Sequence, residues 1–169
     1  MEAALASMRR AVTVLPAGSW REAEPVATAT LPFDQRHRRR IRMLDDAGQP
    51  FLLDLDRPAT LTDGDGLGLA GGGMIRVRAA EEEVIEARGA TTAEVARLAW
   101  HLGNRHTPVQ VLADGTLRLA EDSVLEAMLH RLGARIIRRR APFAPEPGAY
   151  FGVARDNHHR HGLDDARED

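Results

Sequence analysis

The stretch "TTAEVARLAWHLGNRHTPVQVLADGTLRLA", Thr91 to Ala120, decides the fold of the second half of the chain. Its first twelve residues place apolar side chains at helical spacing behind a capping box, and we expect Gly103 to stop this helix as its C′ residue. Asp114-Gly115 then stands between two short apolar runs, as in the turn of a β-hairpin. The stretch therefore predicts a helix followed by two antiparallel strands.

The segments on either side of this stretch extend the pattern. "EEVIEAR" before it and "ARIIRRRAPF" after it are predicted strands, and "DSVLEAMLHRLGA" is a second helix with Ser123 as its cap and Gly133 at its end. The resulting order, β-α-β-β-α-β, is the ferredoxin-like split βαβ arrangement. That arrangement hosts many functions and identifies none of them.

The first half of the chain has strand character instead. "RHRRRIRML", the turn "DDAGQP" and "FLLDLD" together predict a hairpin. We therefore predict an α+β protein with a β-rich N-terminal domain over residues 1–79 and a ferredoxin-like domain over residues 80–148. Residues 149–169, rich in proline, glycine and charge, are predicted to be a flexible His-containing tail.

The composition excludes several kinds of chemistry. The 169 residues include no cysteine, and none of the 23 basic residues is lysine. Thiolate nucleophiles, cysteine-ligated metal sites, P-loop nucleotide binding and Schiff-base catalysis are therefore excluded. No apolar run approaches the ~20 residues of a membrane-spanning helix, and no signal peptide is visible, so we expect a cytoplasmic protein with no membrane partner.

The basic run "RHRRRIR" is the feature that most suggests nucleic-acid binding. No aromatic residues interleave with it to stack on bases, and the net charge of −2 gives no overall attraction to nucleic acid. In a strand, Arg36, Arg38, Arg40 and Arg42 would share one face. We expect that face to be solvated or to meet an acidic partner protein, and we expect no nucleic-acid partner.

The histidines are the candidate metal ligands. His101 and His106 are five residues apart, which separates them by about 140° on a helix, so we do not expect them to chelate one metal together. His101 belongs to the helix and has a structural or surface role. His106 follows the predicted helix stop, where an exposed side chain can act as a metal ligand or in catalysis.

A second group of histidines lies in the tail. His158, His159 and His161 fall within four residues, a pattern that suits a divalent ion, although a solvated polar tail has the same composition. Imidazole binds nickel, copper, zinc and iron, so the type of ligand does not select among these metals.

Several motifs together resemble the UreE family of urease accessory proteins, which are nickel metallochaperones. These motifs are "HLGNRHTPVQV", "LPFDQRHRRRIRM", "DLDRPATLTDGDGL", "VLEAMLHRLGARI" and "APFAPEPGAY". The resemblance implies a non-enzymatic protein with an N-terminal domain of a partner- or peptide-binding type. It also implies a homodimer formed through the C-terminal domains, with His106 binding nickel at the dimer interface.

The resemblance further implies that His158, His159 and His161 add ligands, and that nickel passes through a GTPase accessory partner toward apo-urease. Zinc or copper could occupy the same site. His130, in the second predicted helix, is expected to be structural. Two other readings stay open: a metal-dependent hydrolase that uses His106, and a general zinc- or copper-binding protein.

Overall fold

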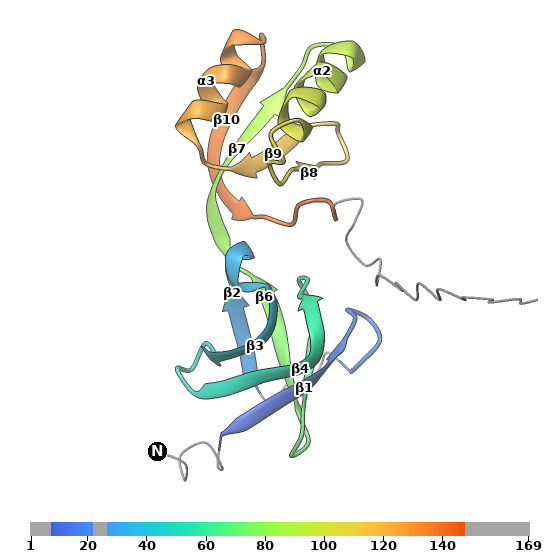
Figure 1. Ribbon diagram of the computed structural model, residues 1–169, viewed down its shortest axis with the longest axis vertical. Coiled ribbons are helices and arrows are strands. Elements are labelled where there is room, and N and C mark those ends of the chain that lie inside the picture. The colour runs from blue at the N-terminus through green and yellow to red at the C-terminus, as the bar shows by residue number, and fades with distance from the viewer. Residues whose placement is uncertain (1–7, 22–26, 148–169) are drawn as a thin grey trace, which may run out of the picture.

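The computed structural model describes residues 8–21 and 27–147 of the chain. These residues form two β-sheets, one for each half of the chain, and the second sheet carries the two described α-helices (Figure 1). The predicted α+β class is therefore confirmed. The tail predicted over residues 149–169 lies outside the described residues.

The N-terminal sheet is a curled sheet whose six described strands follow the order β2-β6-β5-β1-β4-β3. Strands β3 and β4 pair antiparallel, which confirms the predicted hairpin, while β1 pairs parallel with β4 and β2 pairs parallel with β6. A short 3-10 turn, η1, follows β2. The bounds are β1 Arg9–Leu15, β2 Ala27–Leu31, η1 Phe33–Gln35, β3 His37–Leu44, β4 Pro50–Thr60, β5 Gly66–Leu69 and β6 Met74–Ala79.

Alternation along these strands explains how the N-terminal core forms. Phe51, Leu53 and Leu55 of β4 are buried, and the residues between them are more exposed. Ile75 and Val77 of β6 are buried with the same period. Successive side chains of a strand point to opposite faces, so this period of two places one face of each strand in a common apolar core.

The C-terminal sheet has the strand order β10-β7-β9-β8, and every pairing in it is antiparallel. The two central strands are the first and third in chain order, which is the split βαβ arrangement predicted above. Leu98 and Leu102 of one helix and Met128 and Leu129 of the other pack on one face of this sheet. The bounds are β7 Glu81–Arg88, α2 Thr92–Gly103, β8 Gln110–Val111, β9 Leu117–Ala120, α3 Ser123–Arg131 and β10 Arg135–Pro142.

Two sequence-based predictions about local structure are wrong. The cap of α3 is Asp122 and not Ser123, because the Asp122 carboxylate accepts hydrogen bonds from the backbone N–H groups of Val124 and Leu125 at 2.8 and 2.9 Å. Arg36 does not share a strand face with the other arginines. It precedes β3 and is buried, and the register then shifts between Arg38 and Arg40.

A buried contact joins the two halves of the molecule. The Arg36 guanidinium donates hydrogen bonds to the carbonyl oxygens of Leu61, in the first half, and of Phe143, just beyond β10. The rings of Phe33 and Phe143 meet edge to face, with centroids 5.2 Å apart. The Phe33 N–H donates to the Glu82 carboxylate at 2.7 Å. Because β6 ends at Ala79 and β7 begins at Glu81, the chain crosses between the sheets beside this contact.

Candidate metal centre

The position of His106 is set by helix α2. The Thr91 hydroxyl accepts a hydrogen bond from the Glu94 N–H at 3.2 Å and caps the start of the helix. Leu98 and Leu102 are buried against the sheet and hold its far half in place. The turn that carries His106 therefore begins from a well-anchored helix end.

The backbone of His106 has the left-handed conformation, with φ of 53°. The His106 N–H donates to the Gly103 carbonyl at 3.0 Å, and the Thr107 N–H donates to the Leu102 carbonyl at 3.3 Å. These two hydrogen bonds form a Schellman motif, in which the left-handed position is usually occupied by glycine. His106 is the one non-glycine residue with a positive φ in the described part of the chain.

The helix ends at Gly103 as predicted, but the prediction that Gly103 is the C′ residue, which lies just past the helix in the left-handed conformation, is wrong. Gly103 is the last residue of α2 and does not have a positive φ. The helical turn continues through Asn104, whose N–H donates to the Trp100 carbonyl at 3.0 Å, and the chain reverses at His106. A left-handed conformation costs an L-residue with a Cβ about 1–2 kcal/mol, and strain of this kind is characteristic of functional positions.

The side chain of His106 is exposed and lines a groove of about 490 Å³. Most of the residues that line this groove are apolar, including Phe33, Ala99, Val109 and Val111. The groove is also lined by Glu146, which lies beyond the last strand. An exposed imidazole beside an apolar surface can bind a metal while the surrounding side chains bury against another protein.

The segment that follows β10 runs along the edge of β8, close to this loop. The Glu146 N–H donates to the Val109 carbonyl at 2.8 Å, and the Glu146 carboxylate accepts from the Val111 N–H at 3.2 Å. The Ala144 N–H donates to the side-chain oxygen of Gln110 at 3.1 Å. Glu146 was not predicted from the sequence. The only sequence feature around Glu146 is the "APFAPEPGAY" stretch. This stretch lacks the periodicity from which pairing with the edge of β8 could be predicted.

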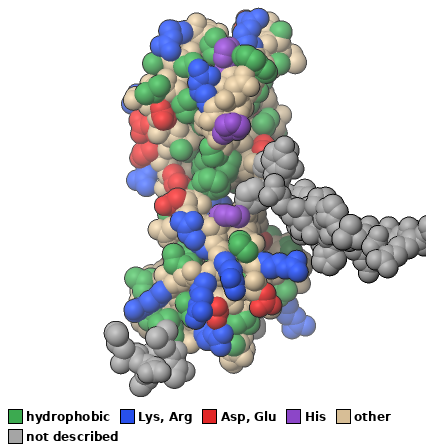
Figure 2. Space-filling model, in the orientation of Figure 1, with side chains coloured by type: hydrophobic (Ala, Val, Ile, Leu, Met, Phe, Trp, Pro, Cys, Tyr) green, Lys and Arg blue, Asp and Glu red, His purple; other side chains and the backbone are tan. Residues whose placement is uncertain are grey.

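The histidine side chains visible in Figure 2 lie apart from one another on this face of the molecule. His101 is half-buried on α2, with its ring edge-to-face against Trp100 at 4.9 Å between centroids. His130 is exposed on α3, with its Nε2 atom 4.0 Å from the Glu126 carboxylate. His37 lies on β3, with Nδ1 2.9 Å from the Thr60 hydroxyl.

Within residues 8–21 and 27–147 of one protomer, no three His, Asp or Glu side chains form a group that could hold a metal ion. The candidate ligands His158, His159 and His161 lie outside the described residues. Of the predicted metal ligands, the structure therefore places only His106.

Comparison with known proteins gives two adjoining matches. The N-terminal domain of the UreE urease accessory protein matches residues 10–80, and its C-terminal domain matches residues 82–168. The chain belongs to the UreE urease accessory protein family. The two matches meet beside Ala80, where β6 passes into β7.

Relatives named urease accessory protein UreE are similar over most of this UreE family member. The protein from Rhodopseudomonas palustris strain BisB18 is 46% identical over 155 residues, which cover 92% of this chain and 72% of the relative. The Beijerinckia indica protein is 46% identical over 152 residues, which cover 89% of this chain and 86% of the relative. The Rhodobacter capsulatus protein is 44% identical over 156 residues, or 92% and 94%.

Membership of this family confirms the prediction that the chain is a urease accessory protein and not an enzyme. The described helices of this UreE family member are too short, or too polar, to cross a membrane.

Proposed function

We propose that this UreE family member is a nickel metallochaperone that binds Ni(II) between two protomers and donates it for assembly of the urease active site. His106 from each protomer supplies the central ligands, and histidines of the tail complete the coordination. Transfer proceeds in the cytoplasm through a GTPase accessory partner. The observation that carries this proposal is the exposed imidazole of His106, held in a strained turn at the end of α2.

The need for a second protomer follows from coordination chemistry. One imidazole is too poor a site for tight binding of a divalent ion, whereas a twofold interface presents the same residue twice. Apolar side chains near His106 support an interface here: Trp100 is 63% exposed and Val111 is 51% exposed. Val111 lines the same groove as His106, and Trp100 neighbours Ala99, which also lines it.

The position of Glu146 supports a role for the tail histidines in nickel binding. The hydrogen bonds of Glu146 hold the chain beside the His106 loop, and His158 follows Glu146 by twelve residues. Twelve residues can span at most about 40 Å, which is enough for His158, His159 and His161 to reach a metal at His106. Tail ligands can dissociate one at a time, which gives nickel a route to the partner's site. Zinc and copper would compete, because imidazole binds all three metals.

Isothermal titration with Ni(II) tests the role of His106. We expect the unmodified chain to bind one tightly held nickel ion per two chains, and the His106→Ala variant to lose this site. His130→Ala is the matched control, because His130 is an exposed histidine on α3. Unchanged tight binding by His106→Ala would refute the assignment, as would equal loss in both variants.

Removal of residues 157–169 tests the tail. We expect the truncated chain to bind nickel with lower affinity or stoichiometry while sedimenting as the same dimer. Identical binding would show that the tail histidines take no part. A reconstituted activation assay with apo-urease and the GTPase partner tests delivery: nickel-loaded protein should activate urease in the presence of GTP, and His106→Ala protein should not.

A further inference from the structure

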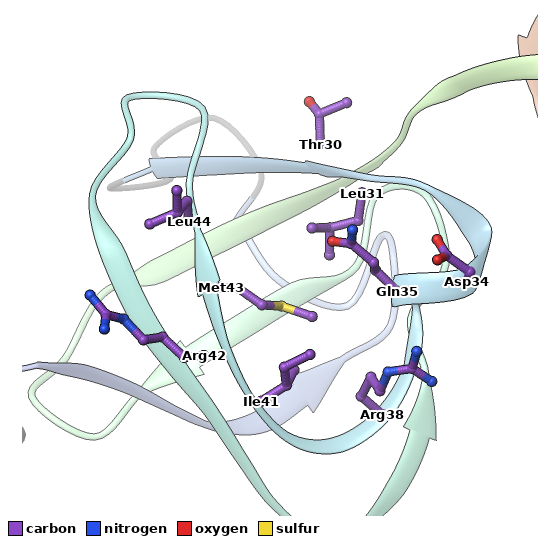
Figure 3. Close-up of a pocket in the computed structure, with 9 residues that line it drawn as sticks. All are labelled: Thr30, Leu31, Asp34, Gln35, Arg38, Ile41, Arg42, Met43 and Leu44. Atoms are coloured by element: carbon purple, nitrogen blue, oxygen red, sulfur yellow. The ribbon is translucent and has the colours of Figure 1, made fainter.

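The two edges of the N-terminal sheet face each other across a groove of about 760 Å³ (Figure 3). Among the described strands, β2 pairs only with β6 and β3 pairs only with β4. Leu31 of β2 and Ile41 and Met43 of β3 point into the space between these strands and form an apolar floor. The curled sheet is therefore incomplete between β2 and β3.

The β2 edge of this groove is already occupied. Asp46, in the turn between β3 and β4, donates its N–H to the Thr28 carbonyl at 2.8 Å. The Asp46 carboxylate accepts from the Thr30 N–H at 2.7 Å and from the Thr30 hydroxyl at 2.9 Å. These bonds close one end of the groove and hold the turn against β2.

The β3 edge is open. The Asp45 N–H donates to the Gln49 carbonyl at 3.0 Å, and the next pair, Leu44 opposite Pro50, lacks an N–H on the β4 side. Because hydrogen-bonded and non-bonded pairs alternate along an antiparallel ladder, the backbone N–H and C=O groups of Leu44 and Arg42 point away from β4. They can pair with a further strand laid along β3.

The charge of this edge defines what it can bind. Strand β3 has four arginines and no acidic residue. Arg38 and Arg42 line the groove, are exposed, and have no carboxylate partner in the described ranges, whereas Arg40 lies 3.3 Å from the Asp54 carboxylate. Asp34 is the one acidic residue that lines the groove on the described part of the chain.

We propose that the groove between β2 and β3 binds an acidic, extended segment of a partner protein, which adds to β3 as an extra strand. Carboxylates on the outer face of this segment pair with Arg38 and Arg42. Apolar side chains on its inner face pack on Leu31, Ile41 and Met43. Along β3, exposed arginines alternate with apolar residues that point inward. A strand that pairs with β3 must therefore alternate acidic residues with apolar residues.

Fluorescence anisotropy with the full chain tests the charge requirement. The probes are two labelled eight-residue peptides, one alternating Glu with Val and one alternating Lys with Val. We expect the Glu peptide to bind and the Lys peptide not to bind. The double variant R38E/R42E should lose about tenfold in affinity for the Glu peptide. The matched double variant R131E/R135E, which changes exposed arginines of the C-terminal half, should bind as the unmodified chain does. Equal binding of both peptides, or unchanged affinity in R38E/R42E, overturns the proposal.

A pair of variants at Leu44 tests strand addition separately from charge. Leu44→Pro removes an N–H that points into the groove, and Leu44→Ala removes only the exposed side chain. We expect Leu44→Pro to bind the Glu peptide roughly fivefold more weakly than Leu44→Ala, as one lost hydrogen bond implies. Equal affinities contradict strand addition. If Leu44→Pro does not fold, two Glu peptides N-methylated at alternate sets of amides replace it: one should lose binding, and binding by both contradicts the proposal.

Other occupants of the groove give distinct results. If removal of residues 148–169 raises the affinity for the Glu peptide about tenfold, the chain's own acidic end occupies the groove and the proposal is wrong. Self-association that the Glu peptide reverses would assign the groove to a second copy. Competition by single-stranded RNA, with no binding of the Glu peptide alone, would assign it to nucleic acid.

Discussion

At the scale of single residues, the left-handed conformation of His106 allows its proposed role in nickel binding to be tested separately from its cost to stability. A left-handed φ of 53° suits glycine and is unfavourable for histidine. We therefore expect His106→Gly to unfold at a melting temperature about 2–4 °C above that of the unmodified metal-free chain, as a gain of about 1 kcal/mol implies. Calorimetry of metal-free protein measures this difference.

His106→Ala is the control for that experiment, because alanine keeps the Cβ that the left-handed conformation disfavours. It should melt close to the unmodified chain, while both variants lose the tight nickel site. A His106→Gly variant less stable than His106→Ala would contradict the conformational argument, since it would mean that the turn needs a side chain at this position for stability.

Asp45 gives a prediction about acid stability. Burial disfavours its ionised form, but hydrogen bonds from the Arg9 guanidinium at 2.7 Å and from the Gln49 and Ala47 N–H groups outweigh burial and lower the pKa of the carboxyl. A carboxyl whose pKa is lowered by folding stabilises the folded state above its unfolded pKa, about 3.9, and this stabilisation is lost as pH falls through the folded pKa.

Asp45→Asn should therefore be less stable than the unmodified chain at pH 7, and the difference should shrink below about pH 4. Urea denaturation at several pH values between about 7 and 3 measures it. A difference that does not change with pH would show that the carboxylate acts only through its shape. Asp56→Asn, at an exposed position of β4, is the comparison.

At the scale of elements, α2 and α3 show which features of a helix can be predicted from the sequence and which cannot. Buried residues recur at helical spacing in both α2 and α3, so the helices themselves were predictable from the positions of Leu98, Leu102 and Leu129. The cap of α3 was less predictable, because Asp122 and Ser123 are adjacent and both are good capping residues. The left-handed turn was not predictable, because its position holds histidine where glycine is usual.

The cap of α3 can be tested with adjacent variants. Asp122→Ala removes the acceptor of two backbone N–H groups and should lower the free energy of unfolding by about 1 kcal/mol. Ser123→Ala should change it by less than about 0.5 kcal/mol. Chemical denaturation of both variants measures the difference, and a larger loss for Ser123→Ala would restore the assignment made from the sequence.

The shape of the groove beside His106 could not be predicted from sequence patterns either. The groove beside His106 combines α2, the loop before β8 and the segment around Glu146, and Phe33 reaches it from the other half of the chain. Periodicity identifies which residues of one element are buried, but it does not show which distant segments meet. The sequence therefore indicated His106 and the helix before it, and the structure added the apolar walls.

At the scale of the whole molecule, the contact between the sheets links the N-terminal half to the proposed metal site beside His106. Phe143 is 1% exposed, packs on Phe33 and accepts a hydrogen bond from Arg36, and it immediately precedes the segment that bonds along β8. Phe143 therefore joins the two halves and also holds the start of the segment that follows β10.

Phe143→Ala should therefore have two effects. The free energy of unfolding should fall by about 3–5 kcal/mol, as for other buried phenylalanines. Amide hydrogen exchange at Glu146 and Val111 should also accelerate, because their hydrogen bonds depend on the position of the segment after β10. Phe143→Leu keeps much of the apolar volume and should show smaller effects. Unchanged exchange at these two amides in Phe143→Ala would show that the segment is held by β8 alone.

Diffraction at the nickel absorption edge, from crystals of the nickel-loaded full chain, tests whether two copies of His106 hold the transported nickel. We expect one anomalous peak on a twofold axis between protomers, about 2 Å from an imidazole nitrogen of His106 on each side. A nickel peak coordinated without His106, or by His106 of one protomer only, would contradict it.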